Sequence, residues 1–136
     1  MSGLRIIIAG GRDFNDYALM KKELDFLFSK DPPEAILSGG AAGADRMGEV
    51  WAKNNSIPLE MHYADWTAHG KAAGYIRNRL MASKANGLVA FWDGQSRGTK
   101  NMIEEAEKRG LAVWVVRTDD PNRADYIVQA KAHEDQ

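Results

Sequence analysis

Three glycine-rich segments of the 136-residue chain carry side chains suited to holding an anion. They read GGRDF at residues 10–14, SGGAAGAD at 38–45 and DGQSRGT at 93–99. Glycine lets a backbone approach a ligand closely, and a helix that begins beside such a loop presents N–H groups and the positive end of its dipole. Phosphate is the ligand that this combination favours. Because paired glycines are also ordinary turns, the prediction depends on all three segments lying together.

The elements around these segments predict that they do meet. Helical spacing of apolar residues and helix-capping residues alternate along the chain with short β-branched runs. Strands are expected at residues 4–9, 35–37, 59–63, 88–92 and 111–116, and helices at 15–28, around Met47, Val50 and Trp51, at 72–84 and from 99 to 109. Residues 64–70 are polar and aromatic and are expected to form an exposed loop.

Alternating strands and helices predict an α/β fold, a three-layer Rossmann-like domain with a five-stranded parallel sheet. The expected strand order is 3-2-1-4-5. Ligands bind such sheets beyond the carboxyl ends of the strands, where the winding direction reverses. The first and fourth strands flank that point. The domain is expected to span residues 1–118, followed by a polar tail at 119–136 in which residues 126–130 could dock as a short helix.

Several of the candidate residues have two interpretations. Asp45 lies in the first turn of a helix, where it can accept hydrogen bonds from ribose hydroxyls or simply favour the helix dipole. Asp13 can fix its loop as an Asx-turn, and the Thr99 hydroxyl can cap a helix or bind a phosphate oxygen. Trp92 ends the fourth strand and can stack on a base. The expected ligand-binding residues are Gly10, Gly11, Arg12, Ser38, Gly39, Gly40, Gly43, Asp45, Arg77, Asn78, Trp92, Gly98 and Thr99.

Composition argues against several other classes of function. With 18 basic and 19 acidic residues the formal net charge is -1, whereas nucleic-acid binders usually carry a basic excess, so a nucleic-acid partner is not expected. The chain has neither GxGxxG after its first strand nor GxxxxGK[ST], which disfavours NAD-dependent dehydrogenases and P-loop ATPases.

Metals, disulfides and membranes are not expected either. Cysteine is absent, and His62, His69 and His133 lack the spacing of metal ligands, so we expect no metal and no cofactor. No apolar run approaches the roughly 20 residues that span a bilayer, and no signal-peptide pattern precedes the first strand. A cytoplasmic location without a membrane partner is the expectation.

The sequence resembles the YspA-like branch of the SLOG superfamily. The resemblance rests on four ordered motifs, GGRDF, SGGAAGADRMGEVWA, GKAAGYIRNRLM and AFWDGQSRGTKNMI, and covers residues 4 to about 116. It implies a Rossmann-like fold with a site for nucleotides or nucleotide-derived ligands, and related folds often form dimers or larger homo-oligomers. The superfamily also contains the LOG phosphoribohydrolases, DprA and nucleotide sensors, so the resemblance fixes no single reaction.

The resemblance also indicates which residues an enzyme of the LOG kind would use. Arg77 falls where LOG enzymes carry an arginine, and Gly98-Thr99 falls on the GT of their PGGxGTxxE signature. Met102 stands where that signature has glutamate. The leading hypothesis is therefore a nucleotide-binding protein or sensor. The alternatives are an N-glycosidase of nucleoside monophosphates, with Arg77 on the phosphate and Asp45 or Asp13 as the acidic group, and DprA-like DNA binding.

Overall fold

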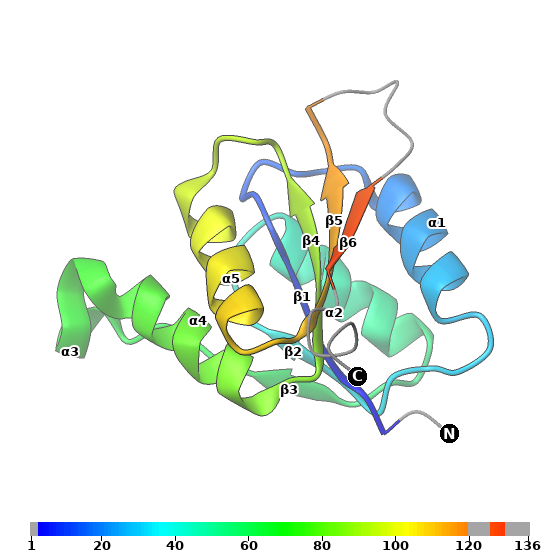
Figure 1. The fold of residues 1–136 in the computed structure, drawn as a ribbon, viewed down its shortest axis with the longest axis horizontal. Coiled ribbons are helices and arrows are strands. Elements are labelled where there is room, and N and C mark those ends of the chain that lie inside the picture. The colour runs from blue at the N-terminus through cyan, green and yellow to red at the C-terminus, as the bar shows by residue number, and fades with distance from the viewer. Residues whose placement is uncertain (1–2, 120–125, 130–136) are drawn as a thin grey trace.

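The computed structural model describes residues 3–119 and 126–129, and within them it contains a single six-stranded sheet in the order β3-β2-β1-β4-β5-β6 (Figure 1). Neighbouring strands among the first five pair in parallel, which confirms the predicted order 3-2-1-4-5. The strands are β1 (Arg5–Gly10), β2 (Ala35–Ser38), β3 (Leu59–Met61), β4 (Gly87–Trp92), β5 (Ala112–Arg117) and β6 (Tyr126–Gln129).

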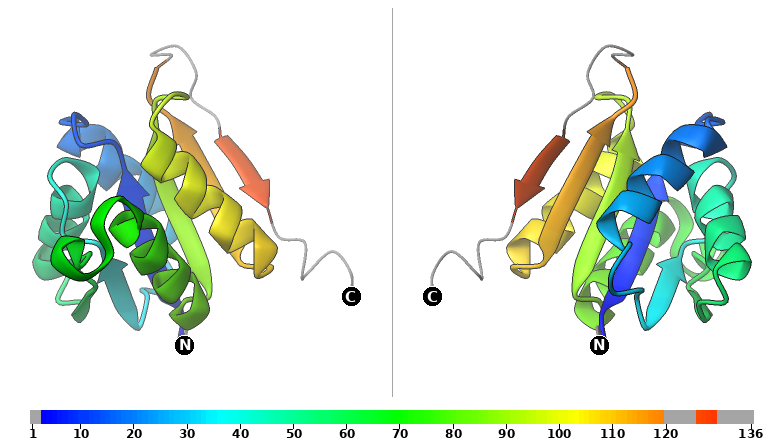
Figure 2. Two further views of the ribbon diagram at one scale, coloured as in Figure 1. Left: turned by 90° about the vertical axis from the view of Figure 1, so that its left-hand side faces the viewer. Right: turned by 90° about the vertical axis from the view of Figure 1, so that its right-hand side faces the viewer.

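Helices cover both faces of the sheet, as Figure 2 shows from its two sides. They are α1 (Tyr17–Leu27), α2 (Ala44–Asn54), α3 (Trp66–His69), the 3-10 turn η1 (Gly70–Ala72), α4 (Ala73–Lys84) and α5 (Arg97–Lys108). Alternate residues of β1 pack into two separate hydrophobic cores, one on each face of the sheet. Ile6 and Ile8 pack under α1 and α2, whereas Ile7 packs under α4 and α5. A strand buried on both faces needs such a continuous apolar run. None of the helices in the described ranges is long and apolar enough to cross a lipid bilayer.

Local sequence explains where α1 begins. The Asp16 carboxylate accepts a hydrogen bond from the Leu19 backbone N–H at 3.0 Å, so Asp16 is the N-cap. Met20 and Leu24, four residues apart, are fully buried against the sheet. The spacing of the apolar residues and the position of the N-cap thus both indicate a helix that begins at Tyr17.

The stretch expected to be a loop contains helical turns. Asp65 accepts a hydrogen bond from the Ala68 N–H at 3.0 Å and caps α3, and η1 then leads directly into α4. A four-residue helix is too short to show hydrophobic periodicity, which is why the sequence pattern missed it.

The end of the chain also differs from the expectation. Tyr126–Gln129 form β6, which pairs antiparallel with β5, so the short helix expected at residues 126–130 is wrong over these four positions; Ala130 lies outside the described residues. Ile127 and Val128 are β-branched and favour a strand, and the pairing supplies partners to backbone groups that an exposed β5 edge would lack. The domain boundary predicted at residue 118 stays a prediction.

Candidate functional site

The loops that follow β1 and β4 border one cavity of about 830 Å³ beyond the carboxyl ends of these strands. Small-molecule sites usually occupy about 300–1,000 Å³, so the cavity is large enough for a ligand of nucleotide size. Its position is the point in the sheet at which the winding direction reverses. Nine of the predicted site residues line it: Gly10, Gly11, Arg12, Asp13, Asp45, Arg77, Asn78, Gly98 and Thr99.

Gly11 and Gly98 face open space inside this border. A Cβ atom added to either glycine would meet no protein atom within 4 Å. Gly10 differs, because a Cβ there would collide with the Phe91 carbonyl oxygen and the Ala44 side chain. Gly10 therefore serves the packing of β1 against β4 and α2, whereas Gly11 and Gly98 leave room for a ligand.

The glycines of the loop that follows β2 do not line the cavity, although Ala41 of the same loop does. Gly43 has a φ of +81°, and a Cβ there would collide with the carbonyl oxygens of Gly11 and Arg12. Gly40, with a φ of +76°, lies against the ring of Tyr63. These glycines permit positive φ and close approach of two loops, which is a structural reason for their presence.

Ser38 and Gly39 also have structural contacts. The Ser38 hydroxyl is fully buried, donates to the Glu49 carboxylate at 2.6 Å and accepts from the Gly40 N–H at 3.1 Å. The α-carbon of Gly39 lies against the Arg77 guanidinium and the Asp45 carboxylate. Neither residue lines the cavity, but both determine where the residues that do line it can lie.

Trp92 is likewise outside the cavity border. Its indole N–H donates to the Ser96 carbonyl at 3.0 Å, and the Arg117 guanidinium lies 5.2 Å from its ring centroid. The ring also packs against the core under α4 and α5. These contacts occupy the surfaces that would otherwise be available for stacking on a base.

Asp45 is the most perturbed acid at the site. It is only 6% exposed, and its Oδ2 accepts a hydrogen bond from the Ala41 N–H at 3.2 Å. Burial raises the pKa of Asp45 to about 6, against the lowering effects of that hydrogen bond and of the Arg77 and Arg12 charges. A carboxyl group with such a pKa exchanges a proton near neutral pH, and so can serve as an acid or a base.

Arg77 connects the loop after β2 to β3 and α4. Its Nη1 donates to the Gly39 carbonyl at 2.8 Å and to the His62 carbonyl at 3.4 Å. Its Nε donates to the Asn78 side chain at 2.9 Å. Burial lowers the pKa of Arg77, and the nearby Asp45 charge opposes this effect.

Asn78 links Arg77 to the start of α5. Its side-chain amide donates to the Asn101 oxygen at 2.9 Å and to the Gly98 carbonyl at 3.3 Å. The chain of contacts therefore runs from the loop after β2, through α4, to the first turn of α5.

The start of α5 is not capped by its own side chain. Ser96 is the N-cap, and its hydroxyl makes no capping hydrogen bond. Thr99 is the third residue of the helix and is therefore not its cap. Its side chain is 3% exposed, and its hydroxyl oxygen lies 3.2 Å from the hydroxyl oxygen of Ser96. The first N–H groups of a helix have no partner within it. Those of α5 begin at the cavity border, beside Gly98.

Several carboxylates at the cavity already accept hydrogen bonds from the backbone. Asp16 caps α1, and Asp93 accepts from the N–H groups of Gln95 and Ser96 at 2.8 and 2.7 Å, which lowers the pKa of Asp93. Within the described ranges, no group of three or more acidic or histidine side chains is arranged to hold a metal ion. The cations at the border are Arg12, Lys71 and Arg77.

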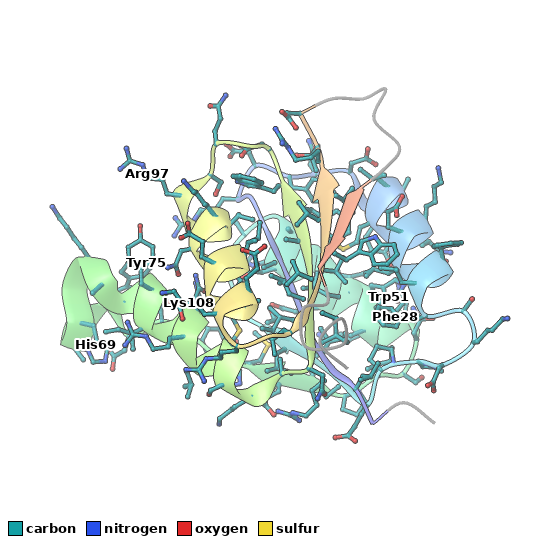
Figure 3. All side chains as sticks on the ribbon, in the orientation of Figure 1. Phe28, Trp51, His69, Tyr75, Arg97 and Lys108 are labelled. Carbon is teal, nitrogen blue, oxygen red and sulfur yellow. The ribbon has the colours of Figure 1, made fainter. Side chains whose placement is uncertain are left out.

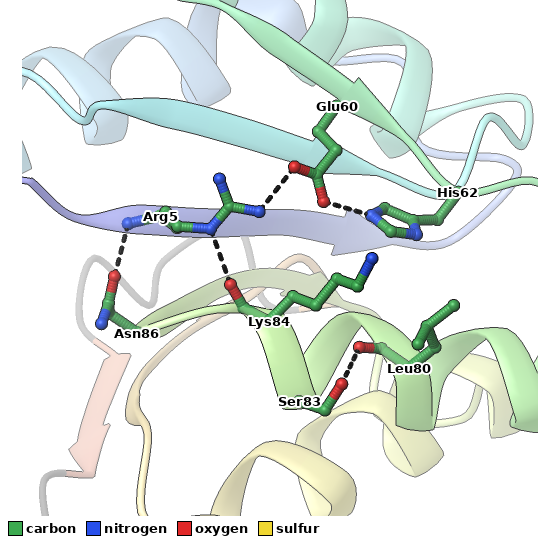
Figure 4. A network of polar contacts seen from close by, with 7 residues as sticks. All are labelled: Arg5, Glu60, His62, Leu80, Ser83, Lys84 and Asn86. Carbon is green, nitrogen blue, oxygen red and sulfur yellow. Dashed lines mark hydrogen bonds and ion pairs between the residues drawn. The ribbon is translucent and has the colours of Figure 1, made fainter.

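A second polar network supports the site from the side of β3 (Figure 4). Arg5 Nη2 lies 2.5 Å from Glu60 Oε1, and His62 Nε2 lies 2.5 Å from Glu60 Oε2. Both contacts lower the pKa of Glu60. Because the His62 carbonyl also accepts from Arg77, this network fixes one of the atoms that orient the guanidinium.

Comparison with known proteins identifies the family. Residues 4–69 match the YspA, cpYpsA-related SLOG family. The gene 61 protein of Mycobacterium phage D29 is 34% identical over 116 residues, which cover 80% of this chain and 93% of the phage protein. The chain belongs to this SLOG family. The resemblance read from the sequence is thereby confirmed.

Two solved structures share the fold of this SLOG protein. DNA processing protein A from Streptococcus pneumoniae matches with a TM-score of 0.67 and 16% identity, over 89% of this chain and 52% of that one. The protein of the same name from Helicobacter pylori, solved to study its binding of single-stranded DNA, matches with a TM-score of 0.64 and 19% identity. The match covers 97% of this chain and 71% of the Helicobacter pylori protein. The chain thus spans about half the length of the first. At these identities the likeness concerns the fold.

The predicted site residues did not include every residue at the border of the SLOG cavity. Lys71, Gly74, Tyr75 and Met81 lie at helical spacing from Asn78, which was predicted, and they line the cavity together with Trp66 of α3. A helical projection of α4 that starts from Asn78 and continues backwards would have found Tyr75 and Lys71 on the same side. Trp66 carries no such signal, because α3 was not recognised.

Proposed function

We propose that this SLOG protein binds a nucleotide or nucleotide-derived small molecule in the cavity beyond the carboxyl ends of β1 and β4, with the ligand phosphate at the start of α5. The observation that carries the proposal is that Gly11, after β1, and Gly98, in the first turn of α5, border the same cavity and each leave open space. Unpaired helix N–H groups beside a glycine favour an anion, and phosphate is the common biological one.

The charges around the cavity support an anionic ligand that carries hydroxyl groups. Arg12 and Arg77 supply cations, and the carboxylates of Asp16 and Asp93 already accept backbone hydrogen bonds. Asp45 can accept a hydrogen bond from a ribose hydroxyl when it is ionised. These features together fit a phosphorylated ribose better than a bare inorganic anion.

Calorimetric titration with AMP, GMP, CMP and UMP tests the proposal. At least one of these compounds is expected to bind and to raise the melting temperature through mass action. Replacing Arg12 by Gln should weaken binding about tenfold or more, since a charge-assisted contact is worth about 1.5–3 kcal/mol. Arg46→Gln is the matched control, because Arg46 is exposed and does not line the cavity. No binding by any of the four nucleotides, or equal losses in the two variants, would refute the proposal.

The second candidate is hydrolysis of the N-glycosidic bond of a nucleoside monophosphate. The observation that favours it is the buried Asp45 at the cavity border, with its pKa raised to about 6. In that reaction Arg77 would hold the phosphate, while Asp45 or Asp13 would assist attack of water. Chromatography would show the free base. Activity that survives Asp45→Asn, Asp13→Asn and Arg77→Ala would rule out these roles.

We also propose that the protein forms homo-oligomers. Tyr63, Ile76 and Leu80 are large apolar side chains exposed around a second, shallow recess of about 150 Å³ beside α4. Sedimentation at increasing protein concentration should reveal a dimer or larger species, and Leu80→Lys should shift it toward the monomer. A monomer at all concentrations would contradict this.

DNA binding is the third candidate and has weaker support. The net charge of -1 provides no general attraction to phosphate backbones. Titration of a labelled single-stranded oligonucleotide at several salt concentrations distinguishes it from nucleotide binding, because affinity that falls steeply with salt marks contacts to many phosphates.

A further inference from the structure

We infer that Trp66 and Tyr75 form the subsite that stacks on the nucleobase of the bound ligand. The inference rests on the proposed nucleotide-binding function and adds the part of the protein that recognises the base. Both side chains line the cavity, and both are exposed, Trp66 by 52% and Tyr75 by 44%. Exposed aromatic side chains at the border of a cavity offer flat faces on which a base can stack.

The other aromatic residues at the border are already packed. Phe91 is fully buried, and the ring of Phe14 stacks on it with centroids 5.3 Å apart. Trp92, which the sequence suggested for stacking, is occupied by Ser96 and Arg117. Among the described residues that line the cavity, Trp66 and Tyr75 are therefore the aromatic side chains available to a ligand.

Trp66 lies beside α4, the helix that carries Tyr75. The end of the Trp66 ring lies 3.6 Å from the position that a Cβ of Gly74 would occupy, and Tyr75 is the next residue of α4. Tyr75 projects from α4 toward the side of the molecule on which Arg97 begins α5 (Figure 3). The Asp65 cap holds the short helix α3 that carries Trp66. Both residues thus have a defined place at the border of the cavity.

Tyr75 is close along α4 to a residue that contacts the proposed phosphate site. Tyr75 and Asn78 are three residues apart, about 4.5 Å along the helix axis. The Asn78 side chain in turn contacts the Gly98 carbonyl at 3.3 Å, at the first turn of α5. A ribose can bridge a gap of this order between a base on the aromatic rings and a phosphate at α5.

The polar surroundings favour a nucleobase over an apolar protein segment. Lys71 and Gln95 line the same cavity as the two rings and can contact the polar edges of a base. The exposed apolar residues Ile76 and Leu80 instead border the separate recess, which shares only Arg77 with the main cavity. Stacking of an aromatic side chain on a base contributes about 1–3 kcal/mol, which corresponds to roughly 5- to 150-fold in affinity.

The test compares two probes on the full-length protein. Calorimetry is run with ribose 5-phosphate and with whichever of AMP, GMP, CMP or UMP binds most tightly. Trp66→Leu and Tyr75→Leu should each weaken the nucleotide by at least fivefold and leave ribose 5-phosphate within twofold. Trp66→Phe should restore most of the affinity. Phe26→Leu is the control, since Phe26 is 67% exposed but lies on α1 outside the cavity.

The possible failures are distinguishable. If wild-type protein binds ribose 5-phosphate and the nucleotide equally well, or if the leucine variants keep wild-type affinity for the nucleotide, this inference is wrong while the proposed function stands. Equal losses for both probes would assign the rings a role in folding. A change in sedimentation without a change in affinity would assign them to a protein interface. Absence of nucleotide binding in the wild type would overturn the proposed function together with the inference.

Discussion

At the residue scale, Asp45 combines burial with access to the cavity. Its carboxylate touches the loop after β2 through Ala41 and lies in the field of Arg77 and Glu49. Burial has the largest effect on its pKa, which it raises from 3.8 to about 6. A carboxyl group in this state is destabilising when ionised, and such groups are frequent in functional sites.

This raised pKa predicts a pH dependence of stability. The folded protein binds the Asp45 proton more tightly than the unfolded chain does, so the free energy of unfolding should fall as the pH rises from about 4 to about 6. The contribution is up to about 3 kcal/mol. Urea unfolding at pH 4.5 and 7.5 should show a smaller difference for Asp45→Asn than for the wild type. An identical pH dependence in both proteins would show that Asp45 titrates normally.

Ser38 tests the structural role of the loop after β2. The substitution Ser38→Ala removes a buried hydroxyl and leaves the Gly40 N–H and the Glu49 carboxylate without that partner. It should lower the free energy of unfolding by about 1–3 kcal/mol. Ser83→Ala is the matched control, because the Ser83 hydroxyl donates to the Leu80 carbonyl on the exposed face of α4 and its loss should cost less than about 0.5 kcal/mol. Equal effects in chemical denaturation would contradict the assignment.

At the scale of elements, the three glycine-rich segments contain glycines in two different environments. The sequence could place all three segments after parallel strands, but it could not separate glycines that border the cavity from glycines that let two loops pack. Gly43 shows the reason: its constraint comes from the carbonyls of Gly11 and Arg12, some thirty residues away in the chain. Contacts of this kind depend on the assembled fold.

Gly98 in α5 provides a test at this scale. A methyl group added there meets no protein atom within 4 Å, and alanine is favoured over glycine in a helix by about 0.5–1 kcal/mol. Gly98→Ala should therefore stabilise the protein slightly while weakening nucleotide binding, since the methyl group occupies space beside the first turn of α5. Thermal melting and calorimetry measure the two effects. A variant that binds as well as the wild type would place the phosphate elsewhere.

The elements that the sequence missed are short or depend on pairing. The helix α3 has only four residues, and β6 acquires its conformation at the edge of β5. By contrast, β1, β4 and α5 have long apolar patterns and lie where the sequence predicted them. The sequence could therefore place the parts of the cavity border that belong to β1, β4 and α5, but not Trp66, which belongs to α3.

At the scale of the whole molecule, the parallel sheet determines where chemistry can occur. The strand order brings the ends of β1 and β4 together, although about eighty residues separate them in the chain. Alternation of strands and helices was sufficient to predict this arrangement, because right-handed crossovers leave few possible orders. The side-chain contacts of Ser38, Arg77 and Trp92 could not be predicted in the same way, since each depends on a partner from another element.

The most direct test of nucleotide binding is an amide NMR titration of ¹⁵N-labelled protein with the nucleoside monophosphate that binds most tightly. Backbone amides of Gly11, Gly98 and Thr99 are predicted to shift together and to saturate at one dissociation constant, while those of Gly40 and Gly43 change little. Shifts confined to the far ends of the strands, or saturable binding that leaves Gly11 and Gly98 unchanged, would contradict a phosphate site at the start of α5.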